Sequence, residues 1–292
     1  MANPVCLSPL KFYDDAAKQC HRKSYAHGNI SPLIVKQRTL PPFQFVIPSD
    51  LYLTGGILTN ATLYDAKTDR VVIDNFVTAL NETGFAIRQY SDFYVAMYTA
   101  QLPVLEDVKE GYYYIKLSSA SDVWAYYSEV FSIMANISDC LELEYWNSVG
   151  NFSIKNGIVA FPSDFHFKLL LKTEIGKPEY NFEEESTKRL GYSYIESQVS
   201  KKTYKFNALA PEFICDAMRI IRLCDNKLIK SDGDEYEAIT FDMEVEWQTQ
   251  GDIASINCEF ETDNVMVNLG GFMPDTPSSG SFNNDFNNDF DN

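Results

Sequence analysis

Short runs of aromatic and β-branched residues recur about ten residues apart through the first half of the chain. Segments such as FQFVI (43–47) and FYVAMYT (93–99) have the length of single strands, and turn-forming segments such as 65–69 separate them. This spacing is typical of a β-sandwich, and here it predicts about seven strands. We therefore expect a β-sandwich domain over residues 41–135. Residues 1–40, which contain turn residues and little periodicity, are predicted to form an extended N-terminal arm.

A long hairpin and a helix are the strongest local patterns in the second half. In AITFDMEVEWQTQGDIASINCEFETD (238–263), apolar residues alternate with polar or acidic ones on both sides of a turn. This alternation predicts paired strands with one apolar and one acidic face. Residues 210–226 carry apolar side chains at helical spacing, and Pro211 suits the first helical position, so a helix should lie on a sheet. We expect an α+β domain over residues 136–271, in a fold that is mainly β with one amphipathic helix.

Residues 174–198 interrupt this pattern. The segment is polar and rich in glycine and proline, and loops of this length are usually functional or disordered. It is predicted to be a long contact loop within the second domain. The chain then ends in an acidic, phenylalanine-containing tail over residues 272–292.

The net charge of −17 is concentrated at one end of the sequence. Residues 231–292 hold fifteen acids and no lysine or arginine, whereas residues 1–230 hold 26 acids and 24 bases. Such an end repels nucleic acid and attracts basic protein surfaces or cations, or it only improves solubility. No apolar run of eighteen residues and no charged leader occurs, so we expect a cytosol-made protein with neither a nucleic-acid nor a membrane partner.

No pattern of reactive residues points to catalysis. The six cysteines and three histidines are scattered, and the sequence lacks the glycine-rich, zinc-binding and nucleophile motifs of common enzymes. His166, between two phenylalanines of a predicted strand, should face away from them and form a hydrogen bond. The sequence therefore predicts a protein that is not an enzyme, with no cofactor and no metal site.

Several segments resemble a group of virion structural proteins from phages and prophages of Bacteroidetes hosts, including crAss-like phages. They are YSEVFSI (127–133), CLELEYWNS (140–148), FKLLLKTEIGKPEYNFEEES (167–186), SKKTYKFNALAPEFICDAMRIIRLCDN (200–226) and EAITFDMEVEWQTQGDIASINCEFETD (237–263). The resemblance spans roughly residues 125–265. It implies a structural subunit of the tail or head-to-tail connector, made in the host cytoplasm and assembled in the virion as a ring of identical copies. Its partners would be itself and other virion proteins.

A ring-shaped assembly needs two different surfaces that meet between neighbouring copies. The acidic face of the predicted hairpin offers one, formed by Glu244, Glu246, Glu259 and Glu261. A mildly basic surface offers the other, formed by Lys201, Lys202, Lys205, Arg219 and Arg222. We hypothesise that the basic surface of one copy meets the acidic face of the next.

The tail carries Phe282, Phe286 and Phe290 at four-residue spacing among Ser, Gly, Asn and Asp. Its composition contains too few apolar residues to fold alone. One interpretation is a solubilising tail with incidental phenylalanines. The other is a peptide that inserts aromatic anchors into pockets of a neighbouring subunit.

Two other functions compete with the virion subunit. Acidic tails with a phenylalanine near the end occur in single-stranded DNA-binding proteins, but the basic groove that such proteins need is missing from this pattern. A carbohydrate-binding or adhesin module would use exposed aromatic side chains for stacking on sugars. Candidates are Tyr112, Tyr113, Tyr114, Trp124, Tyr126 and Tyr127.

Overall fold

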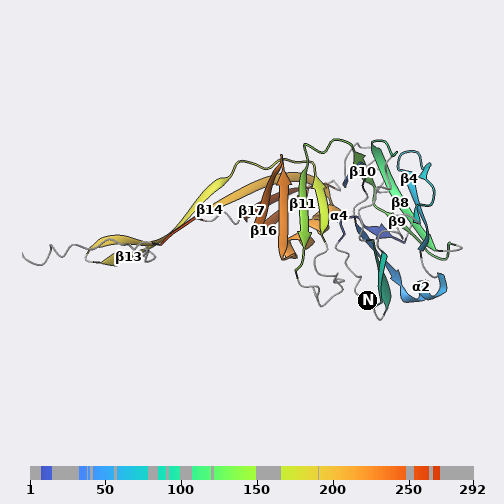
Figure 1. The fold of residues 1–292 in the computed structure, drawn as a ribbon, viewed down its shortest axis with the longest axis horizontal. Coiled ribbons are helices and arrows are strands. Elements are labelled where there is room, and N and C mark those ends of the chain that lie inside the picture. Colours follow the sequence, from blue (N-terminus) through green and yellow to red (C-terminus); the bar gives the residue numbers. More distant parts are fainter. Residues whose placement is uncertain are drawn as a thin grey trace, which may run out of the picture. The chain divides into compact units, whose positions relative to one another are not determined.

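The computed structural model describes residues 8–14, 33–37, 39, 42–55, 58–77, 85–89, 92–98, 107–119, 122–148, 166–189, 191–247, 253–262 and 266–269, and most of them lie in strands (Figure 1). The prediction of a mainly β fold is confirmed. The chain divides into two units, which we call the main unit (residues 1–179 and 203–263) and the hairpin unit (residues 180–202 and 264–292).

A small antiparallel sheet forms one layer of the main unit. Its strands, in spatial order, are β3 (Phe43–Pro48), β7 (Phe93–Tyr98) and β6 (Phe85–Gln89), and the short helix α2 (Ser49–Gly55) follows β3. The ring of Phe45 on β3 lies 6.1 Å from that of Trp124 and 6.2 Å from that of Tyr126, centroid to centroid. Because Tyr126 belongs to a strand of the large sheet and Trp124 directly precedes that strand, these aromatic contacts hold two sheets face to face, as in a sandwich.

The large sheet begins beside this layer. β8 pairs with β4 on one side and with β9 and β10 on the other, and β1 and β5 extend the two sides. The bounds are β1 (Phe12–Tyr13), β4 (Leu58–Asp65), β5 (Val71–Ile73), β8 (Gly111–Ser119), β9 (Ala125–Ser128) and β10 (Phe131–Met134).

The same sheet continues through the second half of the chain. From β10 the order of hydrogen-bonded neighbours is β10-β2-β12-β11-β15-β16-β17-β14. The bounds are β2 (Ile34–Lys36), β11 (Leu141–Trp146), β12 (Phe167–Leu171), β14 (Tyr192–Pro211), β15 (Asn226–Ser231), β16 (Asp234–Trp247) and β17 (Ile253–Thr262).

The strand β2 changes the predicted domain division. It pairs in parallel with β10 and, through Ile34 and Leu170, antiparallel with β12, so it joins strands of both predicted domains in one sheet. The boundary expected at residue 135 consequently falls inside the main unit. The described parts of the expected N-terminal arm contain the strands β1 and β2 of this unit, and Leu33, Ile34 and Val35 are buried in it. A three-residue apolar run among turn residues is too short to show periodicity in the sequence.

The helix α4 (Glu212–Leu223) is shorter than the expected span of 210–226 and packs against β16 and β17. Pro211 precedes its first turn as the N-cap in extended backbone. The residues expected on its apolar face are buried, among them Phe213, Ile214, Met218 and Ile221. The helix therefore lies on the sheet as predicted, since one apolar stripe covers the apolar face of the hairpin.

The hairpin of β16 and β17 departs from strict alternation at one point. The register between the two strands shifts between Ala238 and Thr240, which marks a β-bulge or a similar irregularity. Ala238 is buried, whereas Ile239 is 58% exposed. Ile239 was expected on the apolar face, and it lies outside because the irregularity reverses the alternation there.

The expected contact loop over residues 174–198 is mostly strand. Residues Glu179–Arg189 form β13, which pairs with β14, and Gly191 takes a positive φ of 85° in the turn between them. The prediction of a loop was wrong because it took a polar segment with glycine and proline to be unable to form paired strands. A hairpin that encloses no core has no apolar face to alternate, and it is held by backbone pairing and polar cross-strand contacts.

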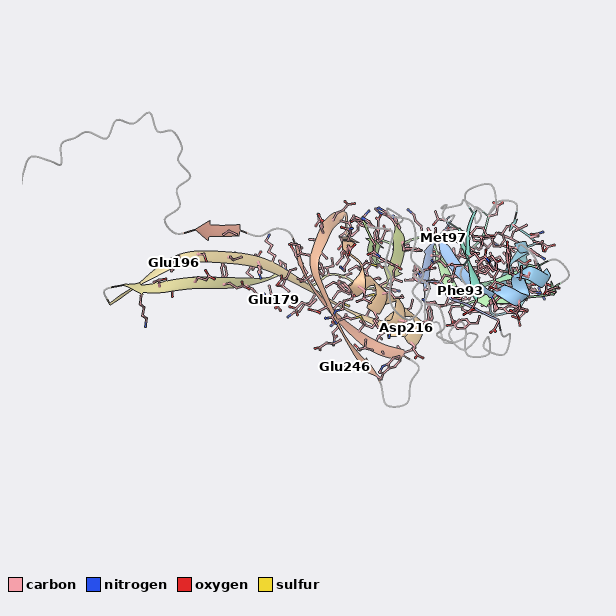
Figure 2. All side chains as sticks on the ribbon, turned by 90° about the horizontal axis from the view of Figure 1, so that it is seen from below. Phe93, Met97, Glu179, Glu196, Asp216 and Glu246 are labelled. Atoms are coloured by element: carbon pink, nitrogen blue, oxygen red, sulfur yellow. The ribbon has the colours of Figure 1, made fainter. Side chains whose placement is uncertain are left out.

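The hairpin unit contains most of β13, the first part of β14 and β18 (Met266–Leu269), which pairs with β14 over Ser197–Ser200. No described strand or helix of this unit lies across either face of the β13–β14 hairpin, on which Glu196 is labelled (Figure 2). None of its residues for which an exposure is described is buried.

Candidate functional site

The predicted acidic and basic partner surfaces meet within one chain. In the register of the sheet, Lys205 on β14 lies opposite Glu259 on β17, which in turn lies opposite Asp242 on β16. Lys205 Nζ is 2.8 Å from a carboxylate oxygen of Glu179 and 3.6 Å from one of Glu259. The hydrogen bond to Glu179 raises the pKa of Lys205 above its ordinary value. Lys205 therefore neutralises part of the acidic face of its own subunit.

The other predicted basic residues also have partners in their own chain. Arg222 lies 2.5 Å from Asp242, and Arg219 lies 3.6 Å from Asp216. The structure thus does not bring the five basic residues together as one free patch.

Lys201 and Lys202 belong to the hairpin unit. Lys201 lies 2.9 Å from Glu183, and Lys202 lies over the ring of Tyr180 at 5.8 Å from its centroid. Both lysines bind residues of β13, so they connect the two strands of the hairpin.

On the acidic side, the predicted residues differ in their surroundings. Glu244 and Glu246 are exposed opposite Asn257 and Ser255, and neither has an ion pair within the described part of the chain. Glu261 is half-buried, and its backbone N–H donates to Thr240 Oγ1. The tail phenylalanines Phe282, Phe286 and Phe290 lie outside the described residues.

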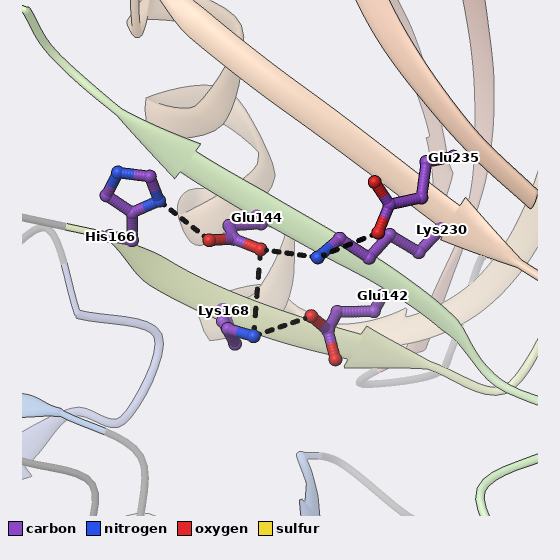
Figure 3. Close-up of polar contacts among 6 residues, drawn as sticks. All are labelled: Glu142, Glu144, His166, Lys168, Lys230 and Glu235. Atoms are coloured by element: carbon purple, nitrogen blue, oxygen red, sulfur yellow. Dashed lines mark hydrogen bonds and ion pairs between the residues drawn. The ribbon is translucent and has the colours of Figure 1, made fainter.

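A second polar site, which the sequence did not predict, lies on the strands β12, β11, β15 and β16 (Figure 3). Glu144 is at its centre, with one carboxylate oxygen 2.7 Å from His166 Nδ1 and the other 3.0 Å from Lys230 Nζ. Lys168 lies 3.6 Å from Glu144 and 2.9 Å from Glu142. Lys230 also reaches Glu235 at 3.3 Å. We call these six residues the Glu144 network.

Strand register explains why these residues meet. Glu144 on β11 lies directly opposite Lys168 on β12, and Glu142 lies opposite both Leu170 on β12 and Lys230 on β15. Neighbouring residues on one face of a sheet are close enough to pair. Alternation along 141–146 shows in the sequence that Glu142 and Glu144 share a face. Their cationic partners come from strands that no local pattern identifies.

Cations stabilise the charged form of Glu144. Its side chain is only 12% exposed, and burial alone would raise its pKa. Hydrogen bonds from Lys230 and His166, together with the charge of Lys168, outweigh burial and hold the pKa below the ordinary value. Both carboxylate oxygens are occupied, so Glu144 is placed to connect strands.

His166 contributes to this connection in two ways. It bonds Glu144, as expected for a histidine that faces away from its phenylalanine neighbours, and its ring stacks on Trp146. The two ring centroids lie 4.2 Å apart and the planes differ by 8°. The contact joins the end of β11 to the residue before β12.

The described part of the main unit has few other reactive side chains. Cys140, Cys215, Cys224 and Cys258 are buried free thiols, and burial raises the pKa of Cys215 to about 11. Among the described residues, no three His, Cys, Asp or Glu side chains are grouped as a metal site. No helix in the described part of the chain is long and apolar enough to cross a membrane.

No protein-family model matches the chain, and no curated protein matches it significantly.

The lowered pKa of Glu144 predicts an acid-sensitive contribution to stability. A carboxyl group with a lower pKa in the folded state stabilises the fold above its unfolded pKa, ordinarily 4.5, and loses this effect as the pH falls through the folded pKa. We expect the melting temperature of Glu144→Gln to depend less on pH than that of the wild type between neutral pH and pH values below about 4. If the melting temperatures of the wild type and of Glu144→Gln changed equally with pH across that range, the assignment would be contradicted.

Proposed function

We propose that this protein is a non-enzymatic structural subunit of a phage virion, in a ring-shaped assembly of the tail or head-to-tail connector. It binds copies of itself and neighbouring virion proteins. The observation that carries this proposal is the hairpin unit, in which most of β13 and the first part of β14 form a β-hairpin with large apolar side chains exposed along it.

A hairpin of this kind has little stability of its own. Two or three strands without a second layer are marginal in water, because no apolar face is removed from solvent. Tyr180 and Phe182 are 58% and 70% exposed, and Ile195 and Val267 are exposed as well. Packing against another subunit would bury these side chains and stabilise the hairpin, so the unit is suited to joining subunits.

Polar pairs keep the hairpin together before it binds. Glu183 bonds Lys201 at 2.9 Å, and Glu184 accepts a hydrogen bond from Gln198 at 2.7 Å. Such exposed pairs each contribute little to stability. They fix the register of the strands, which sets the position of Tyr180 and Phe182 for contact.

The competing functions have less support. DNA binding needs unpaired cations in a groove, whereas Lys205, Arg219 and Arg222 each pair with acids of their own chain. Sugar stacking needs exposed aromatic faces, but Tyr113, Tyr114, Trp124 and Tyr126 are buried.

Purified full-length protein should form a closed oligomer of defined copy number. Native mass spectrometry would give the mass, and negative-stain electron microscopy would show the ring-shaped particle. A monomer at every concentration tested, alone and with neighbouring virion proteins, would contradict the proposal.

A further inference from the structure

A pocket opens in the main unit where β2 lies beside β12. It has a volume of about 180 Å³. It is lined by Leu33, Ile34, Val35, Lys36, Thr39, Pro42, Ile137, Glu142, Lys168 and Leu170. We call it the β2 pocket.

The β2 pocket has the size and lining of a site for one aromatic ring. A cavity of about 150 Å³ with apolar walls is large enough to bind benzene. Leu33 and Val35 are buried, and Leu170 and Ile137 contribute partly exposed aliphatic side chains. An aromatic side chain that enters would remove both its own surface and these walls from water.

The charges at the pocket favour an acidic ligand. Lys168 already neutralises Glu142, at 2.9 Å. Lys36 is exposed, and no described acid pairs with it. The lining therefore presents one uncompensated positive charge beside an apolar cavity.

The chain itself contains a segment with the matching chemistry. Residues 270–292, which follow β18, lie outside the described part of the chain. Within them, SGSFNNDFNNDFDN (279–292) places Phe286 and Phe290 directly after an aspartate and Phe282 three residues before one, with no basic residue. Each repeat offers one aromatic ring and a nearby negative charge, and three repeats raise the effective concentration of rings at the pocket.

We propose that the β2 pocket binds a phenylalanine of this C-terminal segment, with an adjacent aspartate near Lys36. The apolar walls take the ring, and the lysine selects a ring in an acidic context. This assigns a receptor to the tail and a ligand to the pocket. The proposal does not depend on ring assembly, because the bound segment can belong to the same chain or to another copy.

The test uses the full chain with Phe282, Phe286 and Phe290 all changed to serine, so that its own tail does not compete. A fluorescent peptide of residues 279–292 is titrated with this protein, and anisotropy reports binding. We expect saturable binding, weakened at least about tenfold when the three phenylalanines of the peptide are replaced by serine. No binding, or equal binding of the serine peptide, would overturn the proposal.

Two variants of the receptor locate the site. Ile137→Trp should fill the cavity and abolish binding, and Lys36→Glu should weaken it several-fold, more so at low salt. Lys177→Glu is the matched control, since Lys177 is also exposed and does not line the pocket. Melting temperatures show that each variant folds. If the folded Ile137→Trp protein binds the peptide like its parent, or Lys177→Glu weakens binding as much as Lys36→Glu, the site is assigned wrongly.

Discussion

Changing Tyr180 and Phe182 together to serine is expected to convert the assembled protein into monomers that remain folded. Both side chains are largely exposed on β13, and none of the hairpin-unit residues for which an exposure is described is buried. Burial of one large apolar side chain stabilises an interface by about 1.5–3 kcal/mol. Two such losses at every contact weaken association by roughly two to four orders of magnitude. Native mass spectrometry at matched concentration measures the loss.

The matched control for this experiment changes Leu53 and Val71 to serine. Both are exposed apolar residues of the main unit, so the control removes similar surface without touching the hairpin. The control should assemble like the wild type. Equal dissociation of both double variants would show that assembly responds to exposed apolar surface in general, and assembly of the Tyr180 and Phe182 variant would disprove the role of the hairpin.

The second large effect is expected for Glu144→Ala, which should lower the free energy of unfolding by about 2–4 kcal/mol. The change leaves Lys230 and His166 without the carboxylate that pairs with both. It also removes the link among three neighbouring strands. For a chain of 292 residues the melting temperature should fall by roughly 3–7 °C. Differential scanning calorimetry and urea denaturation measure the two quantities.

Glu235→Ala serves as the comparison within the Glu144 network. Glu235 pairs with Lys230 at 3.3 Å, but its side chain is 60% exposed. An ion pair at such a site contributes about 0–1 kcal/mol, because water screens it. If Glu235→Ala and Glu144→Ala lowered the free energy of unfolding equally, the central position of Glu144 would not add to the stability of the fold.

Local patterns predicted several elements of the fold. Regularly spaced runs of aromatic and β-branched residues predicted β3 and β7, alternation predicted β11, β16 and β17, and helical spacing predicted α4 and its buried face. These patterns can be read from the sequence because each depends on whether a few neighbouring side chains face the core or the solvent. The same method failed for β13 and the outer part of β14, since a hairpin with both faces exposed shows no alternation.

The candidate sites were harder to predict, because their residues are distant in the sequence. Lys205 was expected on a basic surface and Glu259 on an acidic one, yet strand pairing places them side by side. The histidine of the Glu144 network was expected to form a hydrogen bond, but no local pattern identified Glu144 as its partner. Three residues of β2 also joined the two halves of the main unit, against the expectation of separate domains.

The sequence by itself determined that the protein is mainly β, that one helix covers an apolar sheet face, and that its acidic charge lies toward the C-terminus. Each of these properties follows from the order of side chains along short segments. Only the tertiary structure decided which strands are neighbours, and with that the Glu144 network, the hairpin with exposed Tyr180 and Phe182, and the β2 pocket. The physical reason is that strand pairing joins backbones that are far apart in the chain, and its register sets which charges and apolar side chains meet.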